Sequence, residues 1–154
     1  MKAVVYDKYA PDDNYKSILQ VKDIPEPKPK PNEVVFKVKA AALNYNDIWG
    51  MRGVPVAVPL PHVSGSDAAG EVTAVGEDVT NFKVGDRVVS HSNMSCRVCQ
   101  ACTDGREYDC TKRTIWGFQT GPVWGAFSEF THLPEVNVAK IPDGVSFEDA
   151  AAAS

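Results

Sequence analysis

Four cysteines, the whole complement of the chain, lie in one short segment and constrain its fold more than any other feature. Their spacing is Cys96-x2-Cys99-x2-Cys102-x7-Cys110. Four thiolates so spaced can surround one tetrahedral Zn²⁺, with each sulfur about 2.3 Å from the metal. Nearby basic residues favour the thiolate form, namely Arg97, Arg106, Lys112 and Arg113. With four protein ligands no position is open to water or substrate, so we expect one structural zinc per chain.

Two disulfides are the alternative use of these cysteines. The first six residues, MKAVVY, carry no signal-peptide pattern, and cytosolic proteins keep their thiols reduced. No apolar run approaches the roughly 20 residues that cross a bilayer. The 16 basic and 20 acidic residues give a net charge of −4, which argues against nucleic-acid binding. We expect a cytoplasmic protein with neither a membrane nor a nucleic-acid partner.

The 154 residues are 44% hydrophobic, enough for one domain spanning residues 1–154. Short strand-like segments alternate with turns, and 33–41 (EVVFKVKAA) shows the period of a half-buried strand. The segment 25–31 (PEPKPKP) cannot pair in a sheet and is either a solvated connector or a proline-recognition ligand. We predict a mostly antiparallel β domain, a partly open barrel with a few short helices, from which the cysteine lobe projects as a long loop. The predicted strands are 2–6, 18–23, 33–41, 69–75, 87–91, 126–133 and 137–141.

A helix is predicted near residue 154. Ser146-x-x-Asp149 has the form of a capping box, and an alanine run follows it. A helix of barely two turns is marginal unless it docks on something. Two interpretations remain: the sequence is cut from a longer protein, or this is a natural C-terminal helix that packs on the barrel.

Three further runs resemble the GroES-like catalytic domain of the medium-chain dehydrogenase/reductase superfamily. They are GSDAAGEV at 65–72, VGEDV at 75–79 and VGDRV at 84–88, and the cysteine spacing matches the superfamily's structural zinc lobe. The resemblance covers the whole chain and implies an NAD(P)H-dependent oxidoreductase. In that family a nucleotide-binding Rossmann domain follows, and no Gly-x-Gly-x-x-Gly fingerprint occurs in these residues. We therefore expect the 154 residues alone to be inactive.

This sequence differs from the zinc alcohol dehydrogenases at two positions where those enzymes bind a catalytic zinc. Asn44 stands where those enzymes have a zinc-binding cysteine, and Ser66 stands where they have a zinc-binding histidine. Both are poor zinc ligands, which argues against a catalytic zinc. His62 and His91 are candidates to rebuild a site, but we interpret them as ordinary structural histidines. Asp47 and Asp67 are interpreted as structural anions.

A narrower resemblance is to the crotonyl-CoA carboxylase/reductase branch. It rests on NYNDIW at 44–49, HVSGSDAAG at 62–70 and IWGFQT at 115–120. It implies reduction of a 2-enoyl-CoA thioester by NADPH, a small-molecule acyl-CoA substrate and a homo-oligomer at full length. Carboxylating relatives have Glu where this chain has Gln119 and generally lack the cysteine quartet. We therefore expect reduction with little carboxylation.

This resemblance implies five catalytic residues. Asn44 and Asn46, expected on one side of an extended segment, would stabilise an enolate oxygen. Tyr45 would lie beside the cofactor or donate a proton, and Phe118 and Gln119 would contact the thioester. The structural alternatives are that Asn44 ties down a turn and that Tyr45 is a core residue. Two other functions remain open: an alcohol dehydrogenase or quinone oxidoreductase of the same fold, and a zinc-stabilised β module that serves only in assembly.

Overall fold

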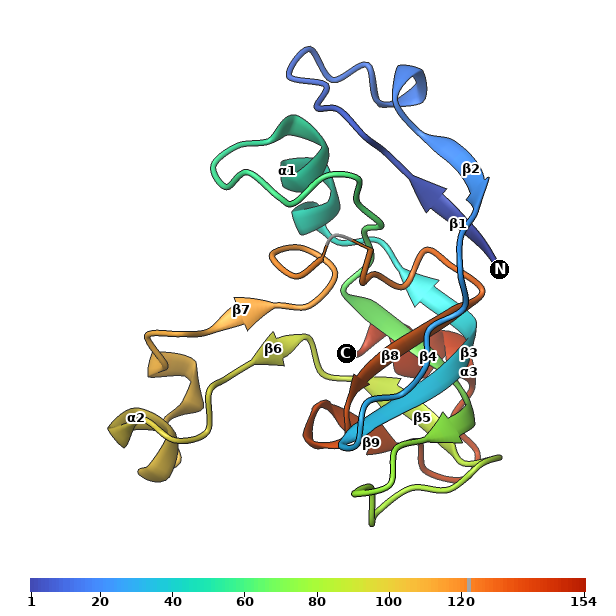
Figure 1. The fold of residues 1–154 in the computed structure, drawn as a ribbon, viewed down its shortest axis with the longest axis vertical. Helices are drawn as coiled ribbons and strands as arrows, with labels where there is room; N and C mark the ends of the chain where they lie inside the picture. The colour runs from blue at the N-terminus through green and yellow to red at the C-terminus, as the bar shows by residue number, and fades with distance from the viewer. Residues whose placement is uncertain (122) are drawn as a thin grey trace.

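A curled antiparallel sheet forms the body of the molecule, in a computed structural model that describes residues 1–121 and 123–154. Its strand order is β8-β3-β4-β5-β9, with β8 and β9 as its edges (Figure 1). The sheet thus closes part of a barrel, which confirms the predicted mostly-β fold. The bounds are β3 Glu33–Ala42, β4 Asp67–Val75, β5 Arg87–Ser90, β8 Phe130–Pro134 and β9 Val138–Lys140.

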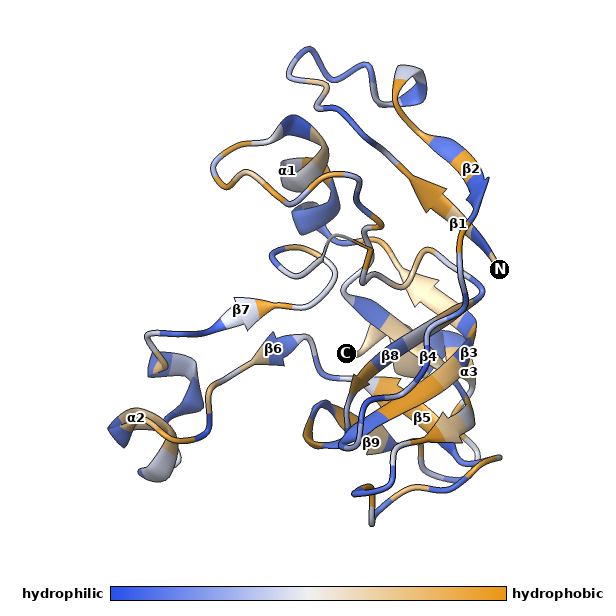
Figure 2. Ribbon diagram, viewed as in Figure 1, coloured by the Kyte–Doolittle hydropathy of each residue, from blue (hydrophilic) through white to orange (hydrophobic). Residues whose placement is uncertain are grey.

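Apolar side chains inside the curl make the main core. Figure 2 shows hydrophobic stretches on β3 and β5. Helix α3 (Phe147–Ala152) begins as predicted, because the Ser146 hydroxyl oxygen accepts the Asp149 N–H at 3.0 Å. Its alanines pack against Ala69 of β4, where small side chains permit a close approach. The core residues are Val34, Phe36, Ala68, Val72, Val88, Trp116, Ala126, Leu133 and Val138.

A second unit packs beside the sheet. The hairpin of β1 (Lys2–Val5) and β2 (Gln20–Asp23) lies next to helix α1 (Tyr45–Arg52), and the 3-10 helix η1 (Tyr15–Ser17) precedes β2 (Figure 1). The Val4 N–H donates to the Phe127 carbonyl at 2.8 Å and so ties the hairpin to the segment before β8. A smaller core joins these parts: Tyr6, Ala10, Ile18, Met51, Val58 and Phe118.

The extended conformation predicted around Asn44 and Asn46 is wrong, because α1 begins there. The Asn44 side-chain oxygen accepts the Asn46 N–H at 3.1 Å, and Asp47 accepts the Asn44 N–H at 2.8 Å. These bonds satisfy N–H groups that a helix start leaves unpaired. Gly53, with φ 74°, ends the helix. Three predicted strands start later than expected: 18–23 at Gln20, 126–133 at Phe130 and 137–141 at Val138.

The cysteine lobe projects from the barrel as predicted, and a two-stranded stalk that the sequence did not predict carries it (Figure 1). Its strands are β6 (Asn93–Met94) and β7 (Thr114–Ile115). Between them lie α2 (Gln100–Thr103) and the 3-10 helix η2 (Glu107–Asp109), and a third 3-10 helix, η3 (Glu135–Asn137), precedes β9. Within the residues that the structure describes, no helix has the length and apolar character needed to span a membrane.

Candidate functional site

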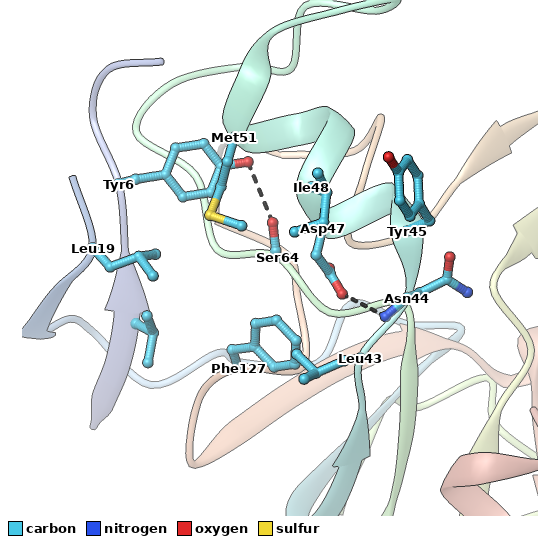
Figure 3. Close-up of a pocket in the computed structure, with 11 residues that line it drawn as sticks. Tyr6, Leu19, Leu43, Asn44, Tyr45, Asp47, Ile48, Met51, Ser64 and Phe127 are labelled. Atoms are coloured by element: carbon cyan, nitrogen blue, oxygen red, sulfur yellow. Dashed lines mark hydrogen bonds between the residues drawn. The ribbon is translucent and has the colours of Figure 1, made fainter. Parts of the chain in front are cut away.

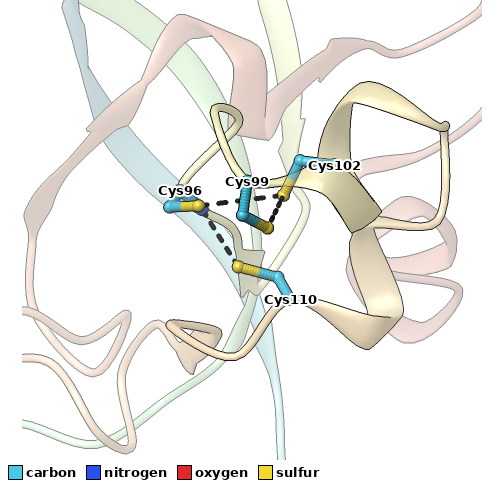
Figure 4. Close-up of side chains that lie close together, drawn as sticks. All are labelled: Cys96, Cys99, Cys102 and Cys110. Carbon is cyan, nitrogen blue, oxygen red and sulfur yellow. Dashed lines mark hydrogen bonds between the residues drawn. The ribbon is translucent and has the colours of Figure 1, made fainter.

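The four cysteine sulfurs converge at the tip of the lobe (Figure 4). All four lie within 4.8 Å of one another, with 3.4 Å between Cys99 and Cys102 and 4.0 Å between Cys96 and Cys102. Sulfurs bound at about 2.3 Å to one tetrahedral zinc lie about 3.8 Å apart, so the cluster fits that metal. All four cysteines are free thiols. The predicted ligand set is therefore brought together, and disulfide pairing is not what the structure holds.

The surroundings of the cysteines shift the pKa values of two of their thiols in opposite directions. Hydrogen bonds from the Val98 and Cys99 N–H groups lower the pKa of Cys96 to about 6. Burial raises the pKa of the Cys102 thiol to about 11, and a bound cation would be needed to favour its thiolate. Of the basic residues expected to offset thiolate charge, Arg97 pairs with Glu107 at 3.1 Å and Arg106 with Asp109 at 2.9 Å. Their charge is thus shared with carboxylates.

A second group of polar residues meets at the N-terminus of α1. Asn44 donates through its side-chain nitrogen to Asp67 at 3.1 Å. The Ser154 hydroxyl donates to the other oxygen of Asp67 at 3.2 Å. Asp47 is buried and accepts the N–H groups of Asn44 at 2.8 Å and Gly65 at 2.9 Å. These bonds link α1, β4 and the end of α3 in one network.

Burial raises the pKa of Asp47 to about 6. The nearby Asp67 carboxylate acts in the same direction, whereas the two backbone N–H donors act in the opposite direction. Because Asp47 also accepts the N–H of Asn44, the residue that caps α1, its protonation is linked to the anchoring of that helix. Asp47 thus holds the structural place that the sequence predicted for it.

An apolar cavity of about 450 Å³ opens beside this network (Figure 3). Residues far apart in the sequence line it: Val4, Tyr6, Leu19, Leu43, Asn44, Tyr45, Asp47, Ile48, Met51, Ser64 and Phe127. The Tyr6 and Ser64 hydroxyls lie 3.3 Å apart within hydrogen-bonding distance, and burial raises the pKa of Tyr6 to about 12. Of these lining residues, the sequence predicted only Asn44 and Tyr45 as part of the catalytic site, because the others share no motif.

The structure does not bring the five predicted catalytic residues together in this cavity. Asn44 and Tyr45 line the cavity, and the exposed Tyr45 ring stacks edge-on against Trp49, so it is not a core residue. Asn46 is half-buried in the first turn of α1. Phe118 is buried in the smaller core. Gln119 uses its side-chain carbonyl to accept the Ile115 N–H at 3.0 Å, and neither of these last two lines the cavity.

The two histidines considered as metal ligands lie apart from the cysteines. His62 is fully buried, and its Nε2 lies 3.0 Å from the Gly117 carbonyl oxygen, as a structural histidine would. His91 is exposed. Over residues 1–121 and 123–154, the cysteine quartet is the one group of His, Cys, Asp and Glu side chains arranged to hold a metal. Ser66 is buried next to Asp67.

Comparisons with known proteins agree with this architecture. Residues 30–143 match the alcohol dehydrogenase GroES-like domain. A crotonyl-CoA carboxylase/reductase of Cereibacter sphaeroides is 37% identical over 86% of this chain and 32% of that protein. An L-threonine 3-dehydrogenase of Photorhabdus laumondii is 34% identical over 84% of this chain and 38% of that protein. A solved NAD-dependent alcohol dehydrogenase superposes with a TM-score of 0.88 at 42% identity, over 99% of this chain and 43% of that one. The chain thus spans less than half the length of these relatives.

Proposed function

The chain belongs to the alcohol dehydrogenase GroES-like domain family of the medium-chain dehydrogenase/reductase superfamily, and we propose that it supplies the substrate side of an NADPH-dependent 2-enoyl-CoA reductase. The reaction is that of the protein carrying this domain, since the cofactor needs a glycine-rich turn and a helix N-terminus. One observation carries the proposal. Asn44, at the position of a zinc-binding cysteine in zinc alcohol dehydrogenases, instead donates to Asp67 at 3.1 Å.

The same polar groups suit an enolate. NADPH would supply the hydride that adds to the β-carbon of the thioester. The Asn44 amide has two N–H donors, of which one bonds Asp67, and we assign the other to the thioester oxygen, where negative charge develops. We assign the proton for the α-carbon to the exposed Tyr45 hydroxyl and keep Asn46 as a second polar group of the site. The cysteine quartet would hold one structural zinc away from this chemistry.

Gln119 supports reduction without carboxylation. Its carbonyl already accepts the Ile115 N–H, so its amide nitrogen is the group left for other contacts. A carboxylate at this position could orient water or CO₂ in ways that a neutral donor cannot. In saturating bicarbonate the expected acyl product is the saturated thioester. A product that is mostly alkylmalonyl thioester would contradict this assignment.

A substrate panel tests the function as a whole. The protein carrying this domain is assayed with NADPH or NADP⁺ on crotonyl-CoA, acryloyl-CoA, simple alcohols, quinones and L-threonine, and its zinc is counted. We expect reduction of the enoyl thioesters and one zinc per chain. Oxidation of alcohols with two zinc ions would favour the second candidate, an alcohol dehydrogenase, which the 42% identity to such an enzyme supports. Turnover of no substrate would favour an assembly module.

A further inference from the structure

The apolar cavity is much larger than a crotonyl group needs. One water-sized group takes about 30 Å³, so 450 Å³ holds about fifteen of them. A crotonyl group has four carbons and one oxygen. The cavity extends away from Asn44 and towards the β1–β2 hairpin, where Leu19 lies (Figure 3), and Val4 of β1 also lines it.

The polar atoms in the wall are already engaged with the protein. The Asp47 oxygens accept the Asn44 and Gly65 N–H groups, and the Tyr6 and Ser64 hydroxyls face each other at 3.3 Å. The other lining side chains beyond Asn44 and Tyr45 are aliphatic, aromatic or thioether. A ligand in the far part of the cavity therefore finds apolar contacts rather than charges.

Two of the apolar side chains that line the cavity remain in water. Leu43 is 86% exposed and Leu19 is 39% exposed, although both line the cavity. A hydrocarbon chain that enters from Asn44 would cover parts of both and gain from the apolar area removed from water. Because the reactive end is fixed at Asn44 and the cavity runs on from there, the occupant is continuous with the reacting group.

We propose that this cavity binds the hydrocarbon tail of the acyl group, so that the preferred substrate is a medium-chain enoyl thioester rather than crotonyl-CoA. The choice of thioester rests on the proposed function, whereas the choice of a hydrocarbon rests on the cavity. Leu19 and Val4 are then residues that set chain-length specificity. They act by limiting how far the tail extends.

Chain-length kinetics tests the proposal. With the protein carrying this domain, kcat/KM for trans-2-octenoyl-CoA should exceed that for crotonyl-CoA by about tenfold or more. Leu19→Trp fills the cavity from a half-exposed position and should remove that preference, so that kcat/KM for trans-2-octenoyl-CoA no longer exceeds that for crotonyl-CoA. Val84→Trp, at an exposed site outside the cavity, is the matched control and should keep the preference. Equal turnover of both substrates by the unmodified protein would overturn the proposal.

A binding experiment separates failure of the cavity from failure of the reaction. Octanoyl-pantetheine cannot be reduced, so its affinity is independent of the chemistry. Octanoyl-pantetheine should bind the unmodified protein and the Val84→Trp variant with the same affinity. Butyryl-pantetheine should bind the unmodified protein about tenfold more weakly, and the Leu19→Trp variant should bind octanoyl-pantetheine about tenfold more weakly. If octanoyl-pantetheine binds in this way but no enoyl thioester is reduced, the proposed function fails and the cavity assignment stands. Absence of binding, or a dimer that Leu19→Trp dissociates, would overturn the assignment.

Discussion

The cysteine lobe and the cavity at α1 are assembled in opposite ways. The lobe draws all its ligands from residues 96–110, and its surface includes Val98 and Tyr108, 79% and 67% exposed. The cavity draws on five separate parts of the chain, held by buried apolar contacts and backbone hydrogen bonds. The stability of a local site of this kind depends on its metal. The shape of a dispersed site depends instead on the core residues packed around it. The experiments below test that difference, beginning with the largest expected effect.

Loss of the lobe metal should unfold the lobe and leave the barrel intact. Cys110→Ser removes one of four ligands, and structural zinc sites contribute about 10–16 kcal/mol in small metal-dependent domains. We expect the bound zinc to fall from one per chain to none, with loss of lobe NMR signals and retention of methyl signals from Leu133 and Val88. Thr111→Ser, beside the ligand, is the control. A barrel that melts together with the lobe would show that the two regions are not independent.

Protonation of Asp47 should change the stability of the cavity region with pH. Because burial raises its pKa to about 6, the folded state binds this proton more tightly than the unfolded state does. The contribution of Asp47 to stability is therefore greatest below about pH 4 and falls as the pH rises to about 6. Asp47→Asn removes this change, so the variant should gain on the order of 2–3 kcal/mol relative to wild type between pH 4 and 7. Denaturant unfolding at several pH values measures it, and parallel curves for the two proteins would contradict it.

Gly50 should tolerate no side chain, although alanine usually stabilises a helix interior by about 1 kcal/mol. A Cβ at Gly50 would lie 2.8 Å from the Tyr6 hydroxyl oxygen, with Val58 and Phe118 close behind. We expect Gly50→Ala to destabilise the protein by about 1–3 kcal/mol. Tyr6→Phe removes the offending oxygen, so the double variant should lose less than the sum of the two single ones. Strict additivity in the unfolding free energies would mean that Tyr6 is not what excludes the methyl group.

Surface ion pairs in the lobe should contribute least. Arg106 contacts Asp104 and Asp109, and all three side chains are about half exposed. Such pairs are worth about 0–1 kcal/mol, so Arg106→Ala should leave zinc content unchanged and shift the lobe's unfolding free energy by less than about 1 kcal/mol. A loss of zinc in this variant would show that the arginine, and not the cysteines alone, holds the lobe together.

The sequence predicted the features whose signal is local. The strand at β3, the turns between strands and the cysteine cluster each depend on residues close in the chain, and each is confirmed, although β3 alternates between exposed and half-buried residues only from Lys37 onward. Helix α1 was missed because Asn44 and Asp47 cap it in place of the more familiar Ser or Thr with Glu, and because Gly50 lies in its interior. The cavity could not be predicted at all. Its Tyr6 and Ser64 hydroxyls meet across 58 residues of sequence, a contact that follows from the long-range backbone pairing of Tyr6 with His62.

The two-stranded stalk has a consequence for how this lineage can change. Asn93 pairs with Ile115 and Met94 with Thr114, so the chain leaves the barrel and returns to it at neighbouring points. A tight turn of about two residues can join such strands. A single genetic deletion or insertion between these points would therefore remove or add the whole lobe without altering the register of any barrel strand. Ancestors and descendants of this protein can thus differ in their demand for metal while inheriting the same cavity.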